Sequence, residues 1–460
     1  MLYVIMMHSA TRKALQRTRG EHGDNVVEEE YLEREDWFVL QAERPGVRAW
    51  KLARSYGLVE KAELIGSAAS STIVRPGGTL LSKISRRGFE LAMLGSLGVR
   101  YLHPERGLAV EAAGESEASA GSITDVPGLK VGHFTDSRRP TGCTAILFED
   151  GATGGVDFDS SGPEDFQAGM LQPGSPLQTI WGILLAGGDS FGLSTALGAM
   201  RYFEEHGKGE PWGPRGMVVP LVVASILDDL SVGDGRIRPD AESGYKACQA
   251  ATAGPVAEGC VGAGAGATVG TGSYYGGLRM KSGIGTASIR VNDFVIGAIF
   301  AVNATGDIVE WPGGRILAGA RRTDGKGFVS ISDSARRNMA ERVAAKTAGD
   351  IRPSMTHTTI GVIATNLVFE KSDLTKLAGL ANTGAAKVIN PYHTTEDGDV
   401  LYAVSTRKLK LPGNQTQRDI ALAGIMGAEV AATAIMRAAK MATSVEGIPA
   451  YRDYTVKLSQ

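Results

Sequence analysis

The chain has 460 residues, of which 43% are hydrophobic and 21% charged, and its formal net charge is −2. This balance argues against a basic nucleic-acid binder, and the length suits one large globular domain or two to three smaller ones. Three widely separated cysteines argue against a disulfide framework or a Cys-rich zinc site, and no uninterrupted apolar run approaches the length of a membrane span. We therefore expect a cytoplasmic protein with neither nucleic acid nor membrane as a partner.

The first 121 residues differ from the rest of the chain. They carry dense mixed charge, as in residues 28–36, and end in a small acidic run over residues 111–121 that is typical of a linker. The apolar start at residues 1–8 precedes basic residues, which is the reverse of a secretory signal. We predict an N-terminal extension of unknown role over residues 1–121, either partly disordered or a small appended domain, followed by a second domain over residues 122–460.

From Ile123 onward, short apolar runs alternate with glycine-containing turns. The predicted strands are Cys143–Phe148, Ile180–Leu185, Met217–Ala224, Val295–Val302, Thr359–Thr365 and Val400–Ser405. The predicted helices are Gly192–His206, Ser334–Thr347, Ser372–Lys387 and Arg418–Ala439, and the apolar spacing of the last indicates a largely buried helix. This mixture predicts an α/β or α+β fold with helices covering sheets.

Two glycine-containing strings have weak functional meaning. Residues 262–267 form G-x-G-x-x-A without the carboxylate that a dinucleotide site places about 20 residues downstream, so we interpret them as close backbone packing or a loop near the active site. Residues 188–192 form G-x-S-x-G after an apolar strand and before a helix, which keeps a serine hydrolase centred on Ser190 as an alternative. The seven histidines form no H-E-x-x-H pair, so we expect no metal and no cofactor.

A threonine pair, Thr358 and Thr359, opens an apolar, β-branched strand. A threonine in this place is usually structural, and the accompanying polar segments at residues 281–288, 302–307 and 396–399 are each consistent with simple turns. It is their occurrence together that suggests chemistry.

Eight motifs occur in order along the chain. They are Ile123–His133, Thr141-Gly-Cys-Thr144, Gly187-Gly188 through Leu193, Gly262-Ala-Gly264 through Gly270, Ala301-Val-Asn303-Ala through Asp307, Ile316-Leu-Ala-Gly-Ala-Arg321, Thr358-Thr-Ile-Gly-Val through Asn366, and Asp397-Gly-Asp399. Together they resemble the DmpA-type family, which contains L-aminopeptidase/D-esterases, β-peptidyl aminopeptidases and nylon-oligomer (6-aminohexanoate oligomer) hydrolases. The resemblance spans about residues 122–445.

This resemblance implies a four-layer α/β/β/α sandwich of the DmpA and ornithine acetyltransferase type. It also implies a hydrolase with an N-terminal nucleophile that cuts its own chain between His357 and Thr358, and processed units that assemble as homo-oligomers. Once it is N-terminal, Thr358 can use its own α-amine as the base, because the reference pKa of that group is about 7.7–8.

The resemblance also implies roles for four other residues. Asn303 is the leading donor to the oxyanion, Lys281 is similar to the catalytic-site lysine of the nylon-hydrolase-like members, and Asp397 and Asp399 match carboxylates that orient Thr358 or bind the ammonium group of a substrate. Phe191 stands where some relatives have Tyr, and His357 stands where many relatives have Asn or Gly.

We therefore expect a cofactor-free amidohydrolase that acts on peptide-like amides with a free amino end, including L-amino-acid amides, β-peptides or 6-aminohexanoate oligomers, through an acyl-enzyme on Thr358. Two alternatives stay open. One is an acyltransferase related to the ornithine acetyltransferases, in which an amine replaces water as acyl acceptor. The other is a binding protein that does not process itself.

Overall fold

The structure is a computed structural model. It describes residues 121–454 except 159, 162, 214, 271–276, 345–356 and 414, together with four short strands in residues 1–120. The chain divides into two compact units, Met1–Glu111 and Ala112–Gln460. In the first unit, β1 (Tyr3–His8) pairs with β2 (Trp37–Ala42), and β3 (Ser70–Ser71) pairs with β4 (Ile84–Ser85), both antiparallel. The predicted linker at residues 111–120 lies outside the described residues, and the boundary at residue 121 stays a prediction.

Nine strands of the second unit are joined to one another by hydrogen bonds, and they divide into two sheets. Sheet A contains β14 (Ile284–Val291), β15 (Phe294–Asn303), β18 (Thr358–Leu367) and β20 (Val400–Leu409). Sheet B contains β5 (Leu129–Thr135), β8 (Ile180–Ala186), β11 (Val222–Ile226) and β7 (Asp165–Phe166). The long β6 (Gly142–Asp157) belongs to both sheets, because its first half pairs with β5 and β8 and its second half pairs with β20.

The passage of β6 from one sheet to the other occurs at an irregularity in its pairing. The register with β8 shifts between Leu147 and Ala152, and Gly151 in this stretch has a φ of 74°. A Cβ at Gly151 would also lie 2.3 Å from the Cγ2 of Thr179. Glycine is therefore required here both by the left-handed backbone and by the close neighbour.

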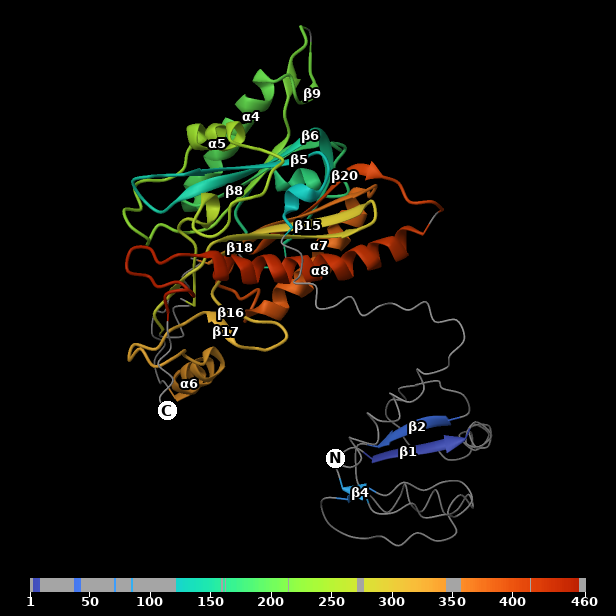
Figure 1. The fold of residues 1–460 in the computed structure, drawn as a ribbon, viewed down its shortest axis with the longest axis vertical. Coiled ribbons are helices and arrows are strands. Elements are labelled where there is room, and N and C mark those ends of the chain that lie inside the picture. Colours follow the sequence, from blue (N-terminus) through green and yellow to red (C-terminus); the bar gives the residue numbers. More distant parts are fainter. Residues whose placement is uncertain are drawn as a thin grey trace. The chain divides into compact units, whose positions relative to one another are not determined.

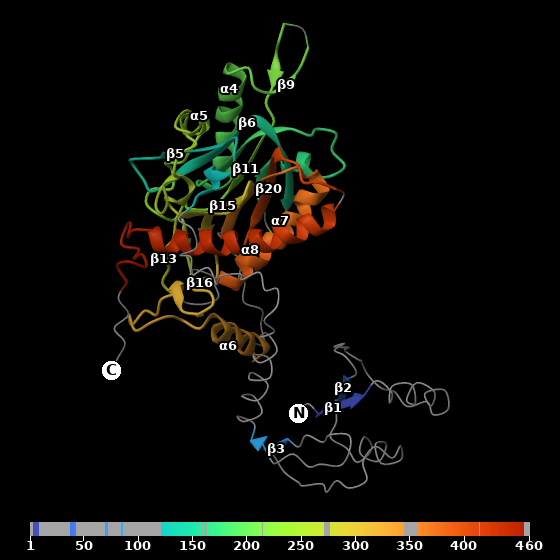
Figure 2. The same ribbon diagram turned by 45° about the vertical axis from the view of Figure 1, so that its right-hand side comes forward.

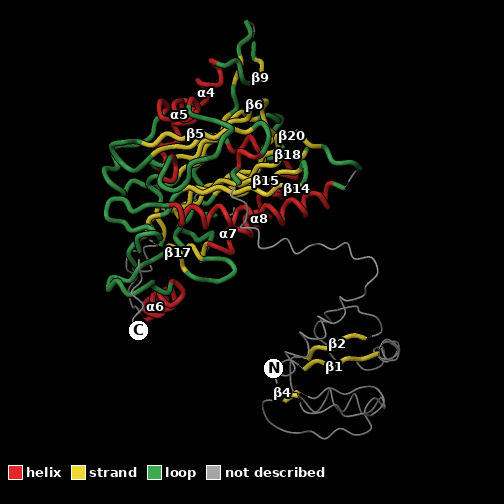
Figure 3. The backbone as a smooth tube through the Cα atoms, in the orientation of Figure 1, coloured by secondary structure: helices red, strands yellow, loops and turns green. Residues whose placement is uncertain are grey.

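Helices cover the outer faces of the two sheets. α4 (Thr195–Glu205) and α5 (Ala241–Gln249) pack on sheet B, whereas α7 (Lys371–Val388) and α8 (Thr416–Met441) pack on sheet A, as Figures 1 and 2 show from two directions. Figure 3 shows the same arrangement as helical segments on either side of the strands. The order of layers is therefore α/β/β/α, which confirms the predicted sandwich.

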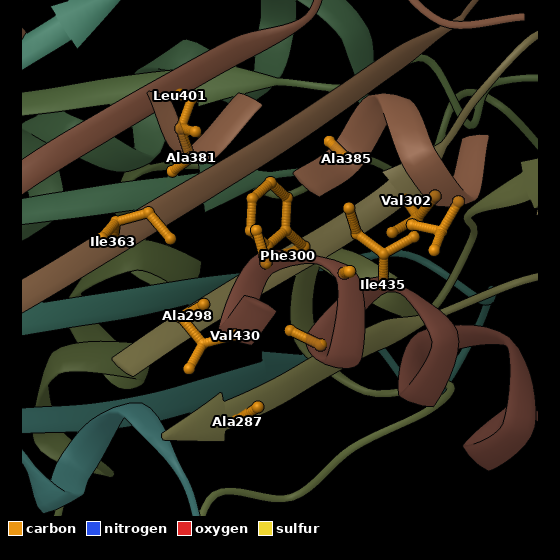
Figure 4. Packing of buried hydrophobic residues seen from close by; sticks show 14 of the residues in the cluster. Ala287, Ala298, Phe300, Val302, Ile363, Ala381, Ala385, Leu401, Val430 and Ile435 are labelled. Carbon is orange, nitrogen blue, oxygen red and sulfur yellow. The ribbon is translucent and has the colours of Figure 1, made fainter. Parts of the chain in front are cut away.

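Three buried hydrophobic cores fill the three spaces between the four layers. One lies between α4 and α5 and sheet B, and a second lies between the two sheets. The third lies between sheet A and the helices α7 and α8, where Phe300 and Ile363 face Ile435 and Val430 (Figure 4). Each sheet is covered on both faces, so both faces of its strands are buried. The strand sequences are therefore nearly continuous apolar runs, as in β18.

The helix α8 is long and apolar enough to cross a membrane by length and composition alone. In the described part of the chain it instead supplies twelve buried residues, and Val430, Ile435 and Ala438 belong to the core under sheet A. Its composition is thus explained by its burial, as the sequence predicted for this segment.

Most predicted elements are found, with three differences. The strand predicted over Met217–Ala224 is interrupted at Pro220, which cannot donate a ladder hydrogen bond, and is split into β10 (Val218–Val219) and β11. The helix predicted from Gly192 begins as a 3₁₀ segment, Asp189–Ser194, and continues as α4. The helix predicted over Ser334–Thr347 is α6 (Ile331–Ala344), and residues 345–347 lie outside the described residues.

The remaining short elements form separate two- and three-stranded sheets and 3₁₀ segments. They are β9 (Glu210–Pro211), which pairs with β10, β12 (Thr268–Val269), β13 (Met280–Lys281), β16 (Asp307–Val309), β17 (Ile316–Ala318), β19 (Ile389–Asn390) and the 3₁₀ segments Ile123–Asp125, Ala168–Leu171 and Gly262–Gly264.

Candidate active site

Thr358 and Asn303 lie directly opposite each other at one end of sheet A. Thr358 is the first residue of β18 and Asn303 is the last residue of β15, and the antiparallel register pairs them. The pair two positions along this register, Ala301 and Ile360, belongs to the core between the sheets. Because side chains alternate along a strand, Thr358 and Asn303 share the face that is turned toward sheet B. Both are nearly buried, at 7% and 1% exposure.

The carbonyl of His357 lies within reach of the Thr358 hydroxyl. Thr358 Oγ1 donates a hydrogen bond of 2.5 Å to His357 O, and the backbone N–H of Gly398 donates to the same oxygen at 2.9 Å. The bond between these two residues is the one that the family resemblance predicts to be cut. The Thr358 hydroxyl, the carbonyl of this bond and a backbone donor to the carbonyl oxygen thus lie together. Gly398 was missed by the sequence analysis, which attended only to the carboxylates on either side of it.

Asp397 and Asp399 hold the two strand ends that carry Asn303 and Thr358. Asp397 Oδ1 accepts a hydrogen bond of 3.1 Å from the N–H of Thr305, two residues beyond Asn303. Asp399 Oδ1 accepts one of 2.6 Å from the N–H of Thr359. Both carboxylates are at least 98% buried. The two carboxylates therefore fix the backbone next to Thr358 and close to Asn303.

Each carboxylate has a second partner on its other oxygen. Thr394 donates to Asp397 Oδ2 through both its N–H and its hydroxyl, and His393 Nδ1 lies 3.1 Å from Asp399 Oδ2. Burial raises the pKa of Asp399 to about 6; the His393 hydrogen bond opposes this rise, and the Asp397 carboxylate adds to it. His393 was not predicted from the sequence, although it stands only six residues from Asp399.

Lys281 is fully buried and bound to backbone. Its Nζ donates to the carbonyl oxygens of Gly264, Ala267 and Ser282 at 3.1, 2.7 and 2.6 Å. Burial lowers the pKa of this ammonium group from its usual range, although the neighbouring Cys260 thiol opposes the change. Lys281 therefore anchors the glycine-rich turn that precedes β12.

Thr268 connects this lysine to the rest of the site. Thr268 pairs with Lys281 in the β12–β13 register, and its N–H donates to Asn303 Oδ1 at 2.9 Å. The hydrogen bond fixes which end of the Asn303 amide is the nitrogen, and Nδ2 then donates to the carbonyl of Asp228 at 3.1 Å. The five predicted site residues thus belong to one connected region. Thr358, Asn303, Asp397 and Asp399 gather at the two strand ends, and Lys281 is linked to them through Thr268.

The contact between Asn303 and Asp228 joins the two sheets, because Asp228 lies just beyond the end of β11 in sheet B. The next residue, Asp229, is buried and forms an ion pair of 2.7 Å with Arg139, and it accepts hydrogen bonds from the Thr141 hydroxyl and the Gly188 N–H. Asp229 was missed, although three of the sequence motifs converge on it.

Close approach to Asp229 explains why two of these motifs contain glycine. A Cβ at Gly187 would lie 2.2 Å from the Asp229 carboxylate, and a Cβ at Gly266 would lie 2.4 Å from it. The string at residues 262–267 begins with a 3₁₀ segment and packs tightly on neighbouring backbone. This is the close packing that we expected, and not the strand-to-helix crossover of a dinucleotide site.

Ser190 has the strand-to-helix context of a nucleophile elbow, but its surroundings are different. Its hydroxyl is exposed and donates to the carboxylates of Glu164 and Asp189. No histidine is among the partners of Ser190 in the described part of the chain, whereas a serine triad needs a base there. Phe191 beside it is 55% exposed, with the Arg238 guanidinium 3.6 Å from its ring centre.

Among the described residues, no group of three His, Cys, Asp or Glu side chains could hold a metal ion. A shallow groove on the outer helical layer is lined by α7 and α8, including Leu380, Ile420 and Ile425. None of the predicted site residues lines this groove.

Comparison with known proteins gives a consistent result. The model of peptidase family S58 matches residues 121–452. An uncharacterized aminopeptidase of Mycobacterium leprae is 33% identical over 73% of this chain and 94% of its own length. A 6-aminohexanoate-oligomer endohydrolase of Kocuria sp. is 28% identical over 69% of this chain and 85% of its own length.

Two solved structures have the same fold at 20% sequence identity and a TM-score of 0.50. A β-aminopeptidase of Burkholderia sp. covers 72% of this chain and 90% of its own. The L-aminopeptidase D-Ala-esterase/amidase of Ochrobactrum anthropi, described as a variant of the Ntn hydrolase fold, covers 71% of this chain and 88% of its own.

Proposed function

The chain belongs to peptidase family S58 and is a self-processing hydrolase of amide bonds, and we propose that Thr358 is the nucleophile both of its maturation and of its turnover. The observation that carries this proposal is the contact of Thr358 Oγ1 with the carbonyl of His357. A hydroxyl adjacent to its own preceding carbonyl needs little movement to attack it.

Maturation begins when Thr358 Oγ1 attacks the carbonyl carbon of His357. The negative charge that develops on His357 O is stabilised by the Gly398 N–H, which already lies 2.9 Å away. Collapse of the tetrahedral intermediate breaks the peptide C–N bond and leaves an ester on Oγ1, and the Thr358 nitrogen takes both the electron pair of that bond and the proton that Oγ1 lost in the attack. Water then hydrolyses the ester, releasing the His357 carboxylate and a free α-amine on Thr358.

Turnover uses the same oxygen with a new base. The Thr358 α-amine takes the hydroxyl proton as Oγ1 attacks the substrate carbonyl, and it later gives a proton to the leaving amine. Asn303, which faces Thr358 in the register, donates from Nδ2 to the oxyanion. Asp397 and Asp399 hold the backbone on either side of this pair, and water releases the acyl group from Oγ1.

We propose small, linear, peptide-like amides with a free amino end as substrates. The proposal is supported by the names of two relatives, an uncharacterized aminopeptidase and a 6-aminohexanoate-oligomer endohydrolase, because both names refer to peptide-like amides. Asp397 and Asp399 are buried, whereas Asp228, whose carbonyl binds Asn303, is half-buried; its Oδ1 accepts a hydrogen bond from the Leu230 N–H, and its exposure makes it the more accessible carboxylate for an ammonium ion. We also expect the processed units to form homo-oligomers.

Intact-mass analysis and N-terminal sequencing of the purified protein test this proposal. We expect two fragments, of which the smaller begins Thr358-Thr359-Ile360, and we expect Thr358→Ala to remain one chain of 48.3 kDa. Thr359→Ala is the matched control, because this neighbouring residue supplies only its N–H to Asp399, and it should still be cut. An uncut wild-type chain, or a cut Thr358→Ala chain, would contradict the proposed nucleophile.

A further inference from the structure

His393 occupies an unusual position beside the candidate site. Its backbone has a φ of 55°, the left-handed region that few residues other than glycine adopt. Its side chain is 20% exposed, whereas the Asp399 side chain that it contacts is 1% exposed. His393 is therefore the partially exposed end of a hydrogen-bonded chain that leads inward through Asp399 to the Thr359 N–H.

The ring of His393 is held on two sides. Its centre lies 3.8 Å from the centre of the Tyr392 ring, and the two planes are tilted by 31°. Tyr392 is itself fixed, because its hydroxyl donates to Asn382 Oδ1 at 3.1 Å and Asn382 donates to Asp157 at 2.7 Å. The imidazole thus has a defined orientation toward Asp399, and it is braced on α7 and β6.

The two ring nitrogens of His393 have different surroundings. Nδ1 lies 3.1 Å from Asp399 Oδ2, whereas Nε2 is buried with no hydrogen-bond partner among the described residues. A neutral ring with its proton on Nδ1 fits these surroundings best, since it donates to the carboxylate and avoids a buried Nε2–H without an acceptor.

We propose that His393 is a positioning residue, whose imidazole holds the Asp399 carboxylate so that Asp399 keeps the Thr359 N–H, and with it the Thr358 nucleophile, in place. The inference rests on the proposed function of Thr358. It adds a residue to the site whose effect reaches the reacting atoms only through Asp399.

The titratable groups around this pair are few. Asp397, Glu396 and Tyr392 lie on the same loop, and His357 lies on the adjoining strand, where it bridges to Asp397. Asp397 raises the pKa of Asp399 and the hydrogen bond from His393 lowers it, with burial the larger effect. Removing the imidazole donor should therefore move the protonation of Asp399 to a higher pH.

Two variants separate the hydrogen bond from the ring. His393→Phe keeps a planar ring against Tyr392 and removes the donor, whereas His393→Asn keeps a donor near the position of Nδ1 and tolerates the left-handed backbone. The substrate-free readout is the rate of self-cleavage after cell-free synthesis of the full chain, measured from pH 5 to 8. The second readout is kcat and KM of the mature enzyme with amino-acid p-nitroanilides.

We expect His393→Phe to slow cleavage at pH 7 about tenfold, the loss of one charge-assisted hydrogen bond, and to lower kcat more than it changes KM. The acid side of its pH profile should lie at higher pH than in the wild type, and His393→Asn should restore both rate and profile to within about threefold. A His393→Phe chain with the wild-type rate and profile would overturn the inference.

An NMR measurement on the uncut Thr358→Ala chain tests the same idea without any change at His393. The ¹⁵N shifts of its imidazole should show the proton on Nδ1 at pH 7.5. A proton on Nε2 would overturn the inference even if His393→Phe failed to fold. A wild-type chain that does not cut itself would instead refute the proposed function, so the two failures are distinguishable.

Discussion

Asn303 and Thr358 face each other as the last residue of one strand and the first residue of its antiparallel neighbour. This pairing places an amide donor and a hydroxyl on the same face of the sheet with side-chain origins about 4.5–5.5 Å apart. The two carboxylates of the Asp397-Gly398-Asp399 turn bind the backbone just beyond each member of the pair. The candidate site is therefore formed by two strand ends, and one loop holds both of them in place.

Replacing Asn303 should impair chemistry more than binding. If its amide stabilises the oxyanion, Asn303→Ala lowers kcat by about 10²–10³-fold with little change in KM. Asn366 is a matched control at the other end of β18, where its side chain binds Val295 N and Asp293 O. Steady-state kinetics should show Asn366→Ala with a near-normal kcat; equal losses in both variants would contradict the oxyanion role.

Lys281 should be important for stability as well as for activity. Lys281→Met removes a donor from three buried carbonyl groups, and each group left without a partner costs about 1–3 kcal/mol. Lys408→Met is the control, because Lys408 forms an exposed ion pair with Asp150, a type of pair that contributes about 0–1 kcal/mol. Thermal unfolding in the Thr358→Ala background measures both, and similar Tm values for the two variants would refute the anchoring role.

The buried, ionised Asp399 carboxylate should lower the stability of the folded chain at neutral pH. In the folded chain its pKa is about 6, above the ordinary value of 3.8, so between these values the folded state binds more protons than the unfolded state. The stability contributed by the protonated group is complete below pH 3.8 and is lost as the pH rises through about 6. Asp399→Asn imitates the protonated form permanently.

We therefore expect Asp399→Asn to raise Tm at pH 7.5 relative to Thr358→Ala alone, when both are uncut chains, and to raise it less at pH 4.5. In a chain that retains Thr358, the same substitution should abolish the fall of the self-cleavage rate on the acid side of its pH profile. A Tm difference that does not grow between pH 4.5 and 7.5 would contradict the burial of an ionised Asp399.

Ser190→Ala should leave self-cleavage and turnover within about twofold of the wild type, because a surface hydroxyl bound to carboxylates contributes little to stability or to a reaction at Thr358. Its partner Glu164 is partly buried. Loss of activity in Ser190→Ala, with a normally cut Thr358, would revive the serine-hydrolase interpretation and would be detected by the p-nitroanilide assay.

Gly361 should tolerate no side chain. A Cβ there would lie 2.4 Å from two atoms of the Phe300 ring, so Gly361→Ala should cost about 1–3 kcal/mol by overpacking. Phe300→Leu in the same chain should recover part of this loss. Gly427→Ala in α8 is the control, since its nearest neighbour would be 3.5 Å away, and unfolding measurements should show it neutral or stabilised.

The sequence pattern by itself determined most of the helices and strands, whereas the α/β/β/α order of the layers followed from the family resemblance. The apolar runs at β8, β15, β18 and β20 and the apolar period of α7 and α8 were sufficient to place these elements, because burial on two faces leaves a strong compositional signal. This compositional signal was weaker for β14, which contains small and polar residues and is stabilised as a strand by its pairing with β15. The eight ordered motifs that resemble a known family then supplied the candidate site residues, Thr358, Asn303, Lys281, Asp397 and Asp399.

Only the tertiary structure decided what these residues touch. Gly398, Asp229 and His393 contact residues that lie 41, 90 and 6 positions away in the chain, namely His357, Arg139 and Asp399 respectively. No local pattern records such contacts, because a lone glycine, aspartate or histidine has many structural uses. The physical reason is that hydrogen bonds and burial are set by residues brought together in space, whereas periodicity reports only which face of an element is buried.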